Sequence, residues 1–386
     1  MQILRFLTDT DATVIDVEYR LLCSGTLYPA NVQGDWRKSD GARILLREPF
    51  NLIVASQPYD DYPQELALRF TTKVVSEQHE SGGKVTSLRS FVPDDEIAAD
   101  LAALLSLLGR RLVTVAGKVR QRFSDGQLPP ELSDFPSPLA MRLKKIFWPP
   151  RLAEVVHHRD GVDFKDNQPA PTPFDWRIVA GILKAIPSHP AAEAIIRSAR
   201  QYALALELIE DRFELAYQQL ISAIETVAGP ALSDWTPEPE SMIESKQWLI
   251  AASRSKGLSI EDAQQLAIEA CARERWASRK FLTFVLKHIN AEVLNGDDDL
   301  FLVPEFARPK GTGIEKTLRQ IYEMRSGASH GGKSYPASAS IGPSPTIPSS
   351  VIHEVLEGKA PFPPIGWFER LVNSAIVGYI KSTMPV

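Results

Sequence analysis

Arg325 and His330 stand near the carboxyl end of the sequence and are followed by Gly331-Gly332. Arginine carries a fixed positive charge that binds carboxylates and phosphates, whereas histidine can accept or donate a proton near neutral pH. On an ideal helix, a spacing of five residues turns two side chains about 140° apart. They would therefore serve one ligand only if the helix deforms at its end, or if two copies of the segment face each other across a dimer.

Arg325 occupies a position where the surrounding pattern favours an apolar residue. Leu318, Ile321 and Tyr322 recur at the spacing of one helix face, and Arg325 is the next position on that face. A guanidinium that is drawn away from water needs a carboxylate, other hydrogen bonds or a phosphate ligand to compensate its charge. Glu225, which flanks the apolar stripe of another predicted helix, is the expected carboxylate partner.

The elements that position these residues are helices, because a helical periodicity of apolar residues continues almost without interruption after Phe174. Ser259 and Asp262 form a capping box that should open one of them. The other predicted helices cover residues 191–209, 212–228, 275–294, 313–324 and 367–381. The sequence therefore predicts an all-α helical bundle at residues 176–386.

The amino-terminal part alternates apolar and polar residues in the way of half-buried strands, as at Val17, Tyr19 and Leu21. Similar apolar runs at residues 43–47, 51–55 and 66–70 predict further strands of an antiparallel sheet. A helix with an acidic first turn should follow, over about residues 94–112. These elements predict an α+β domain at residues 1–127.

Prolines are frequent between the two parts, and each restricts the backbone around it. We therefore expect a proline-rich connection at residues 128–175, with only a short helix around residues 139–147.

The composition favours a soluble globular protein, since 44% of the 386 residues are hydrophobic and 24% are charged. The formal net charge of −5 argues against a protein that coats nucleic acid through a general basic excess. Cys23 and Cys271 are too few and too far apart for a disulfide framework or a four-cysteine zinc site. The sequence has no recognisable signal peptide or long apolar run, and we expect a cytoplasmic protein without membrane contact.

The pattern Arg-x(4)-His-Gly, on a helix led by an aromatic residue, resembles the signature of the HEPN superfamily, and more narrowly its Apea-like branch. The resemblance covers about residues 191–381. The segments that carry it are Tyr322-Glu-Met-Arg325-Ser326, His330-Gly331, Phe213 to Glu225 and Ala277 to Leu282.

The resemblance implies a helical bundle that forms a homodimer, with the motifs of two subunits lining one cleft. Many members of the superfamily are metal-independent endoribonucleases, which implies RNA as the partner and neither a metal nor a cofactor. His330 would act as general acid and base for attack by a ribose 2′-hydroxyl, Arg325 would clamp the phosphate, and Glu225 would orient Arg325. The further residues expected to contact the RNA are Tyr322, Ser326, Gly331 and Lys333.

The resemblance also suggests a biological setting. Members of the superfamily act as toxins in prokaryotic antiviral defence or stress response, and the amino-terminal domain would then recognise a protein or phage-derived trigger.

Two other interpretations stay open. The nuclease members often have Asn, Asp or His after the arginine, whereas this sequence has Ser326, so the alternative is a non-catalytic HEPN module that serves dimerisation or partner binding. Residues 327–334 also match the Walker A pattern of nucleotide-binding proteins. The predicted helix before this segment and Tyr335-Pro336 after it do not supply the strand and helix that a phosphate-binding loop needs.

Other candidates have simpler explanations. His157 and His158 suggest metal binding, but they lack a second pair of ligands, and a surface position on a helix is expected. The basic residues between positions 110 and 122 could guide RNA, although a solvated helix face is their expected place. Tryptophans near predicted loops could stack on bases, with core or hinge packing as the default; these are Trp148, Trp176, Trp235 and Trp248.

Overall fold

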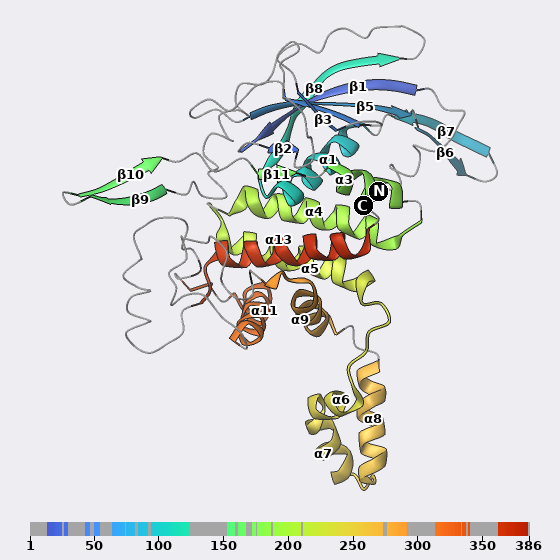
Figure 1. Cartoon of the computed structure of the whole chain (residues 1–386). Coiled ribbons are helices and arrows are strands. Elements are labelled where there is room, and N and C mark those ends of the chain that lie inside the picture. Colours follow the sequence, from blue (N-terminus) through green and yellow to red (C-terminus); the bar gives the residue numbers. More distant parts are fainter. Residues whose placement is uncertain are drawn as a thin grey trace.

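The structure is a computed structural model of the chain. It describes residues 14–24, 27–29, 43–46, 50–54, 64–73, 75–81, 84–91, 94–123, 153–158, 161–166, 172–174, 176–186, 188–209, 211–272, 276–291, 293, 313–332, 334–336, 339 and 362–384. A sheet region from the amino-terminal part lies on a helical region from the later part (Figure 1). The predicted order, an α+β part followed by a helical part, is confirmed at this level. No helix in the described ranges has the length and apolar character needed to cross a membrane.

The main sheet has five antiparallel strands in the order β3-β4-β5-β1-β8. The strands are β1 (Val14–Cys23), β3 (Arg43–Leu46), β4 (Phe50–Val54), β5 (Gln64–Lys73) and β8 (Val113–Phe123). The next two strands, β6 (Val75–Ser81) and β7 (Lys84–Phe91), form an antiparallel hairpin.

The alternating pattern of the sequence marks the buried face of this sheet. Tyr19 on β1 is paired with Leu68 on β5, and Leu21 with Leu66, and all four side chains are buried. Residues two apart on a strand share a face, so directly opposed apolar pairs stack along one side of the sheet. This side packs on the core.

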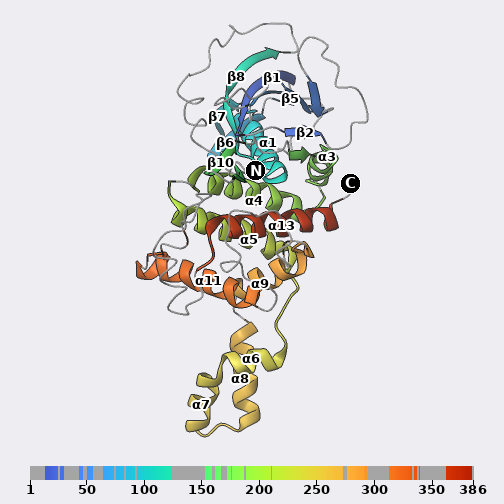
Figure 2. The ribbon, with the colours of Figure 1, turned by 60° about the vertical axis from the view of Figure 1, so that its left-hand side comes forward.

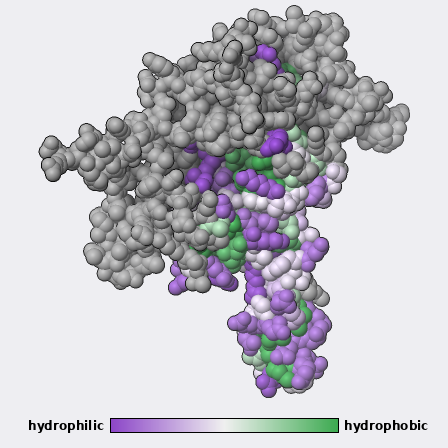
Figure 3. Space-filling model, viewed as in Figure 1, coloured by the Kyte–Doolittle hydropathy of each residue, from purple (hydrophilic) through white to green (hydrophobic). Residues whose placement is uncertain are grey.

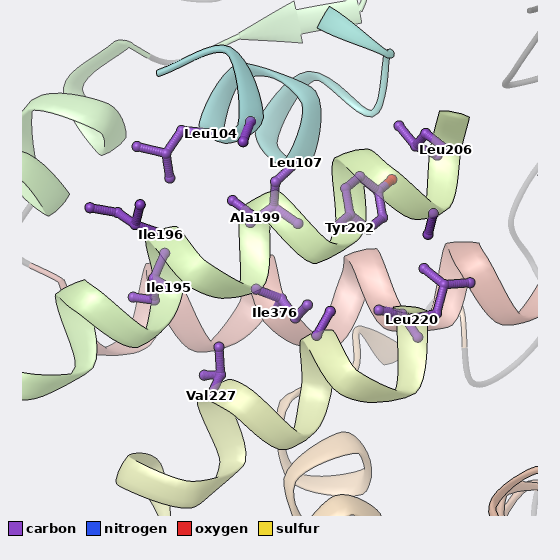
Figure 4. Packing of buried hydrophobic residues seen from close by; sticks show 14 of the residues in the cluster. Leu104, Leu107, Ile195, Ile196, Ala199, Tyr202, Leu206, Leu220, Val227 and Ile376 are labelled. Carbon is purple, nitrogen blue, oxygen red and sulfur yellow. The ribbon is translucent and has the colours of Figure 1, made fainter. Parts of the chain in front are cut away.

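Helix α1 (Asp94–Gly109) lies between the sheet and helix α4 (Pro190–Leu208) (Figure 1). Its first turn holds three acidic residues, which the positive end of the helix dipole favours. Apolar residues on all sides of α1 are buried, as expected of a helix that is covered on both sides. Figure 4 shows Leu107 of α1 in the same cluster as Ala199 of α4 and Ile376. One hydrophobic core therefore continues from the sheet into the helices.

The helical region is centred on α4, α5 and α13, with α9 and α11 on the side away from the sheet (Figures 1 and 2). The bounds are α3 (Trp176–Ala185), α5 (Phe213–Ala231), α9 (Ala277–His288), α11 (Gly313–Gly331) and α13 (Ile365–Thr383). Helices α4, α5, α9, α11 and α13 confirm five predicted helices. At Gly378, α13 passes so close to α9 that a Cβ atom would collide with the carbonyl oxygen of His288.

Buried polar contacts also hold the sheet region to the bundle. Arg110, directly after α1, donates to both carboxylate oxygens of Glu369 on α13, with 2.7 Å between Nη2 and Oε2. The hydroxyl of Tyr202 on α4 donates to the same carboxylate. The side-chain amide of Asn373 donates to the carbonyl oxygen of Leu107 at 2.6 Å. The end of α1 is therefore bound by α13, whose Glu369 is bound in turn by α4.

Three helices project away from the bundle: α6 (Pro239–Ser245), α7 (Gln247–Ser255) and α8 (Ile260–Ala272) (Figures 1 to 3). The backbone N–H of Asp262 donates to the hydroxyl of Ser259 at 3.0 Å, so the predicted cap opens α8. The three helices have a small core of their own, formed by Ile250, Ala263 and Ala267.

Strands form in two places where the sequence analysis did not predict them. Residues 113–123 form β8, so Arg120 and Arg122 lie on a strand and not on a helix face. Within residues 128–175, β9 (Ala153–His158) and β10 (Gly161–Asp166) form an antiparallel hairpin where only a short helix was expected. The predicted helix at residues 139–147 lies outside the described residues. Local periodicity carries no information about pairing between strands, and these strands are defined by their pairing.

The proline-rich stretch also returns to the amino-terminal part. Its last strand, β11 (Thr172–Phe174), pairs in parallel with β2 (Leu27–Pro29).

Helix α11 is longer than predicted. We expected it to end near Met324, but it continues through Gly331 and stops before Gly332, whose φ of +64° is the left-handed conformation that glycine favours. Ala328 packs against the core, which extends the helical contact beyond the expected end. Arg325 and His330 therefore belong to one continuous helix.

Candidate functional site

Glu225 lies on α5 at the edge of the apolar face that packs into the bundle. Ile221 and Ile224 on that face are fully buried, whereas the Glu225 side chain is 23% exposed. A residue at the edge of an amphipathic face can keep a charge near water while it touches a neighbouring helix. For Glu225 this neighbour is α11.

Two side chains from successive turns of α11 bind the two oxygens of Glu225. The hydroxyl of Tyr322 donates to Oε1 at 2.5 Å, and Nη2 of Arg325 donates to Oε2 at 3.3 Å. Residues three apart lie on one face of a helix, so both can reach the same carboxylate. The ion pair that the sequence led us to expect is present.

The Arg325 side chain is 30% exposed, so the guanidinium lies neither in the core nor in bulk solvent. A guanidinium has five N–H donors in a planar fork. The contact with Glu225 uses one of them. Arg325 can therefore hold Glu225 and an anionic ligand at the same time.

The aromatic ring of Tyr322 supports this arrangement. Its centroid lies 5.8 Å from Cζ of Arg325 and 5.4 Å from the ring centroid of Phe281 on α9. Burial raises the pKa of the Tyr322 hydroxyl, and the hydrogen bond to Glu225 raises it further, while the charge of Arg325 opposes the shift. At neutral pH the hydroxyl therefore stays protonated and remains a donor to Glu225.

The other predicted site residues are placed as follows. Ser326 is exposed next to Arg325, and Gly331 is the last residue of α11. The backbone of His330 belongs to α11, but its side chain and the whole of Lys333 lie outside the described residues. Because the helix is continuous between Arg325 and His330, the two positions are turned about 140° apart. A deformed final turn does not bring them together.

The Walker A interpretation is wrong for this segment. Residues 327–331 are part of α11, and a helix precedes them. A phosphate-binding loop instead wraps its ligand with non-helical backbone between a strand and the start of a helix.

Tyr335 was missed by the sequence reasoning. It is 7% exposed, and its ring stacks on Tyr217 of α5 with 5.0 Å between the centroids. Burial raises the pKa of Tyr335 to about 12, with Arg325 lowering it and Glu214 raising it. A tyrosine four residues after the end of a helix has no sequence signal that predicts such a position.

The remaining candidates give no second site. His157 and His158 lie on strand β9, not on a helix as expected. Across the described part of the chain, no group of three or more His, Cys, Asp or Glu residues is arranged to hold a metal ion. Trp235 packs against the core, as expected. Trp248 on α7 is 67% exposed, so the expectation that it packs in the core is wrong.

Comparison of the chain with protein family models, with curated proteins and with solved structures finds no match.

Proposed function

We propose that this chain is a HEPN-type protein of the Apea-like kind, which binds single-stranded RNA and cleaves it without a metal ion. The observation that carries the proposal is the half-buried Arg325, which Glu225 and Tyr322 hold near the end of a helix that also bears His330. The bundle that α11 forms with α4, α5, α9 and α13 supports it as well. A positive charge with donors beyond the one that contacts Glu225, on the same helix as a residue that can carry a proton, suits a phosphodiester substrate.

The proposed reaction uses the ribose as its own nucleophile. His330 takes the proton of a 2′-hydroxyl, whose oxygen attacks the adjacent phosphorus while the bond to the 5′-oxygen breaks. The leaving 5′-oxygen takes up a proton, so the products are a 2′,3′-cyclic phosphate and a 5′-hydroxyl. Arg325 stabilises the charge that accumulates at phosphorus, and Glu225 keeps Arg325 in place.

We also propose a homodimer through the helical region. Positions 325 and 330 are turned about 140° apart on α11, so Arg325 of one copy and His330 of the second are the pair that would act on one phosphate. A protein or phage-derived trigger is proposed for the sheet region, because this region shares its core with the helices that carry the site.

The nuclease proposal is tested with purified protein and a labelled single-stranded RNA in the presence of EDTA. Wild-type protein should cut the RNA, and Arg325→Ala and His330→Ala should each abolish cutting while changing the melting temperature little. Arg319→Ala is the matched control, because Arg319 is an exposed arginine on the same helix that pairs with Glu315. Unchanged cleavage by the two site variants would remove both residues from the mechanism.

A non-catalytic module for dimerisation or partner binding is the second candidate. The mutual neutralisation of Arg325 and Glu225 favours it, because such a pair can set the register of two helices without chemistry. In that case Glu225→Ala and Arg325→Ala should lower stability or dissociate the dimer, measured by thermal unfolding and by light scattering during gel filtration. An equally stable and intact dimer would count against this candidate.

A further inference from the structure

Four of the seven large apolar side chains that are exposed in the described part of the chain lie on one projecting part of the molecule. We call this part, helices α6, α7 and α8 at residues 239–272, the arm. Figure 3 shows apolar surface on the arm beside strongly hydrophilic surface. A group of exposed apolar residues on one small element is typical of a binding surface. The four residues are Trp248, Leu258, Ile260 and Leu266, which are 67%, 39%, 38% and 40% exposed.

The core of the arm is small for a separate folding unit. The three helices pack mainly on one another, and their own hydrophobic cluster consists of Ile250, Ala263 and Ala267. Two of these three residues are alanines, which bury little apolar surface. Units of fewer than about 40 residues usually need a further source of stability, such as oligomerisation. Covering the exposed apolar residues of the arm would supply it.

The exposed face of α7 is uncharged along its centre and basic beside it. The centre is an exposed stripe at helical spacing, formed by Trp248, Ala251, Ala252 and Ser255. The small residues beside Trp248 leave room for the side chains of a second helix. Arg254 and Lys256 are exposed at the same end of the helix, and no acidic residue occurs between positions 246 and 260.

The exposed face of α8 carries the opposite charge. An exposed stripe of the same spacing runs along it, formed by Asp262, Gln265, Leu266 and Glu269. The side-chain amide of Gln265 donates to Oε1 of Glu269 at 3.1 Å, so both side chains lie along this stripe. Helix α8 contains three acidic residues and no basic one. The exposed faces of α7 and α8 are therefore complementary in charge, and each has one large apolar residue.

We propose that the arm binds the arm of a second copy of this chain, with the exposed face of α7 in each copy against the exposed face of α8 in the other. A two-fold axis makes this contact twice, so four helices pack together and cover Trp248 and Leu266 of both copies. A nucleic acid strand is a poorer occupant, because residues 239–272 contain five acidic and three basic residues. The contact is separate from the proposed pairing of sites on α11, and it does not depend on RNA cleavage.

Reversal of charge tests the pairing of unlike faces. One variant carries Arg254→Glu with Lys256→Glu. A second carries Gln265→Lys with Glu269→Lys. Each variant alone sets like charges against each other in both contacts, so its association should weaken at least about tenfold in sedimentation velocity at about 1 to 100 µM. An equimolar mixture should associate as strongly as wild type, because both contacts then join opposite charges. A mixture that associates no better than either variant would overturn the proposal.

Trp248→Ala tests the apolar part of the contact. Association should weaken at least about thirtyfold, because a tryptophan covered at an interface is a typical hot spot and the dimer contains two. Leu266→Ala should weaken it by a smaller factor, and both variants should melt close to wild type in dilute solution, since both side chains are exposed in a single copy. Leu204→Ala is the matched control for Leu266→Ala, because Leu204 is 41% exposed and lies outside the arm on α4. Equal losses in these two leucine variants would contradict a contact through the arm.

The outcomes also separate this contact from the others proposed. If the charge-reversed variants and Trp248→Ala associate like wild type, the arm contact is wrong and pairing through the bundle stands. If they become monomers, the arm contact stands as the one that joins the copies. A wild-type monomer at about 100 µM would overturn the arm contact. So would a variant with Arg254→Glu and Lys256→Glu that associates normally but binds a fluorescent single-stranded oligonucleotide more weakly, since the basic face would then serve nucleic acid.

Discussion

Two arginine–glutamate pairs hold elements of this protein together in different regions. At the junction of the sheet region and the bundle, Arg110 makes three contacts of 2.7 to 3.1 Å with Glu369, and the two side chains are 18% and 0% exposed. Between α5 and α11, Arg325 makes one contact of 3.3 Å with Glu225, and the side chains are 30% and 23% exposed. In both regions a tyrosine hydroxyl donates to the same glutamate, from Tyr202 in the first and Tyr322 in the second.

The two pairs differ in how deeply their side chains are buried and in how many N–H donors of the arginine contact the glutamate. A buried ion pair is tolerated only when its charges and hydrogen-bonding groups are satisfied inside the fold. The pair of Arg110 and Glu369 meets this demand and therefore ties elements together. The pair of Arg325 and Glu225 is looser and half-exposed, and it can accept a further anion. This difference supports the proposed ligand site at Arg325, whereas the contacts of Arg110 tie α1 to α13.

The largest effect that would test this comparison is a loss of stability. Glu369→Ala should lower the free energy of unfolding by about 3–5 kcal/mol, because it leaves the largely buried charge of Arg110 without this carboxylate and Tyr202 without this acceptor. Glu225→Ala should cost only about 1 kcal/mol, because Arg325 can turn to solvent. Guanidinium chloride unfolding measures both, and equal losses would erase the distinction.

A smaller effect should appear in alkaline solution. Burial is the main cause that raises the pKa of both Tyr202 and Tyr322. The stabilising contribution of a raised pKa is complete below the unfolded value of about 10 and is lost as pH rises towards the folded value, at up to about 1.4 kcal/mol per pH unit. The pKa of each hydroxyl is raised well above its ordinary value, so both tyrosines contribute to the loss of stability in alkaline solution.

Urea unfolding between about pH 9 and pH 12 measures this loss. Tyr202→Phe and Tyr322→Phe should each remove part of the alkaline destabilisation in this range, because each deletes a hydroxyl that stays protonated in the folded protein and ionises in the unfolded chain. A variant whose stability falls with pH as steeply as that of wild type would show that its tyrosine does not contribute to the loss.

The smallest effect is that of salt. Raising sodium chloride from about 0.05 to 0.5 M should weaken the coupling between Arg325 and Glu225 by a few tenths of a kcal/mol, because half-exposed charges are screened. The coupling between Arg110 and Glu369 should change less, since Glu369 is buried. Double-mutant cycles at the two salt concentrations report each coupling energy. A stronger salt response in the buried pair would contradict the assignment.

Part of the fold could be predicted because it depends on local periodicity. Alternating apolar residues such as Tyr19 and Leu21 predicted a strand, and apolar residues at the spacing of one helix face predicted the helices of the bundle. Strand β8 was missed because its partner β1 is far away in the sequence. The end of α11 was missed because Ala328 extends the helix through contact with a core that other helices supply.

The candidate site likewise has features that the local sequence predicts and features that only the packing of distant residues decides. The sequence alone determined that position 325 puts a charge on an apolar helix face, and that this charge needs an anionic partner, because helical geometry depends only on neighbouring residues. The tertiary structure decided that Tyr322 shares Glu225 with Arg325, that Arg110 binds Glu369, and how deeply each pair is buried. It also decided that the fold leaves the Tyr335 hydroxyl without a partner among the described residues. These features depend on the distances between elements, which are set by the packing of residues that lie far apart along the chain.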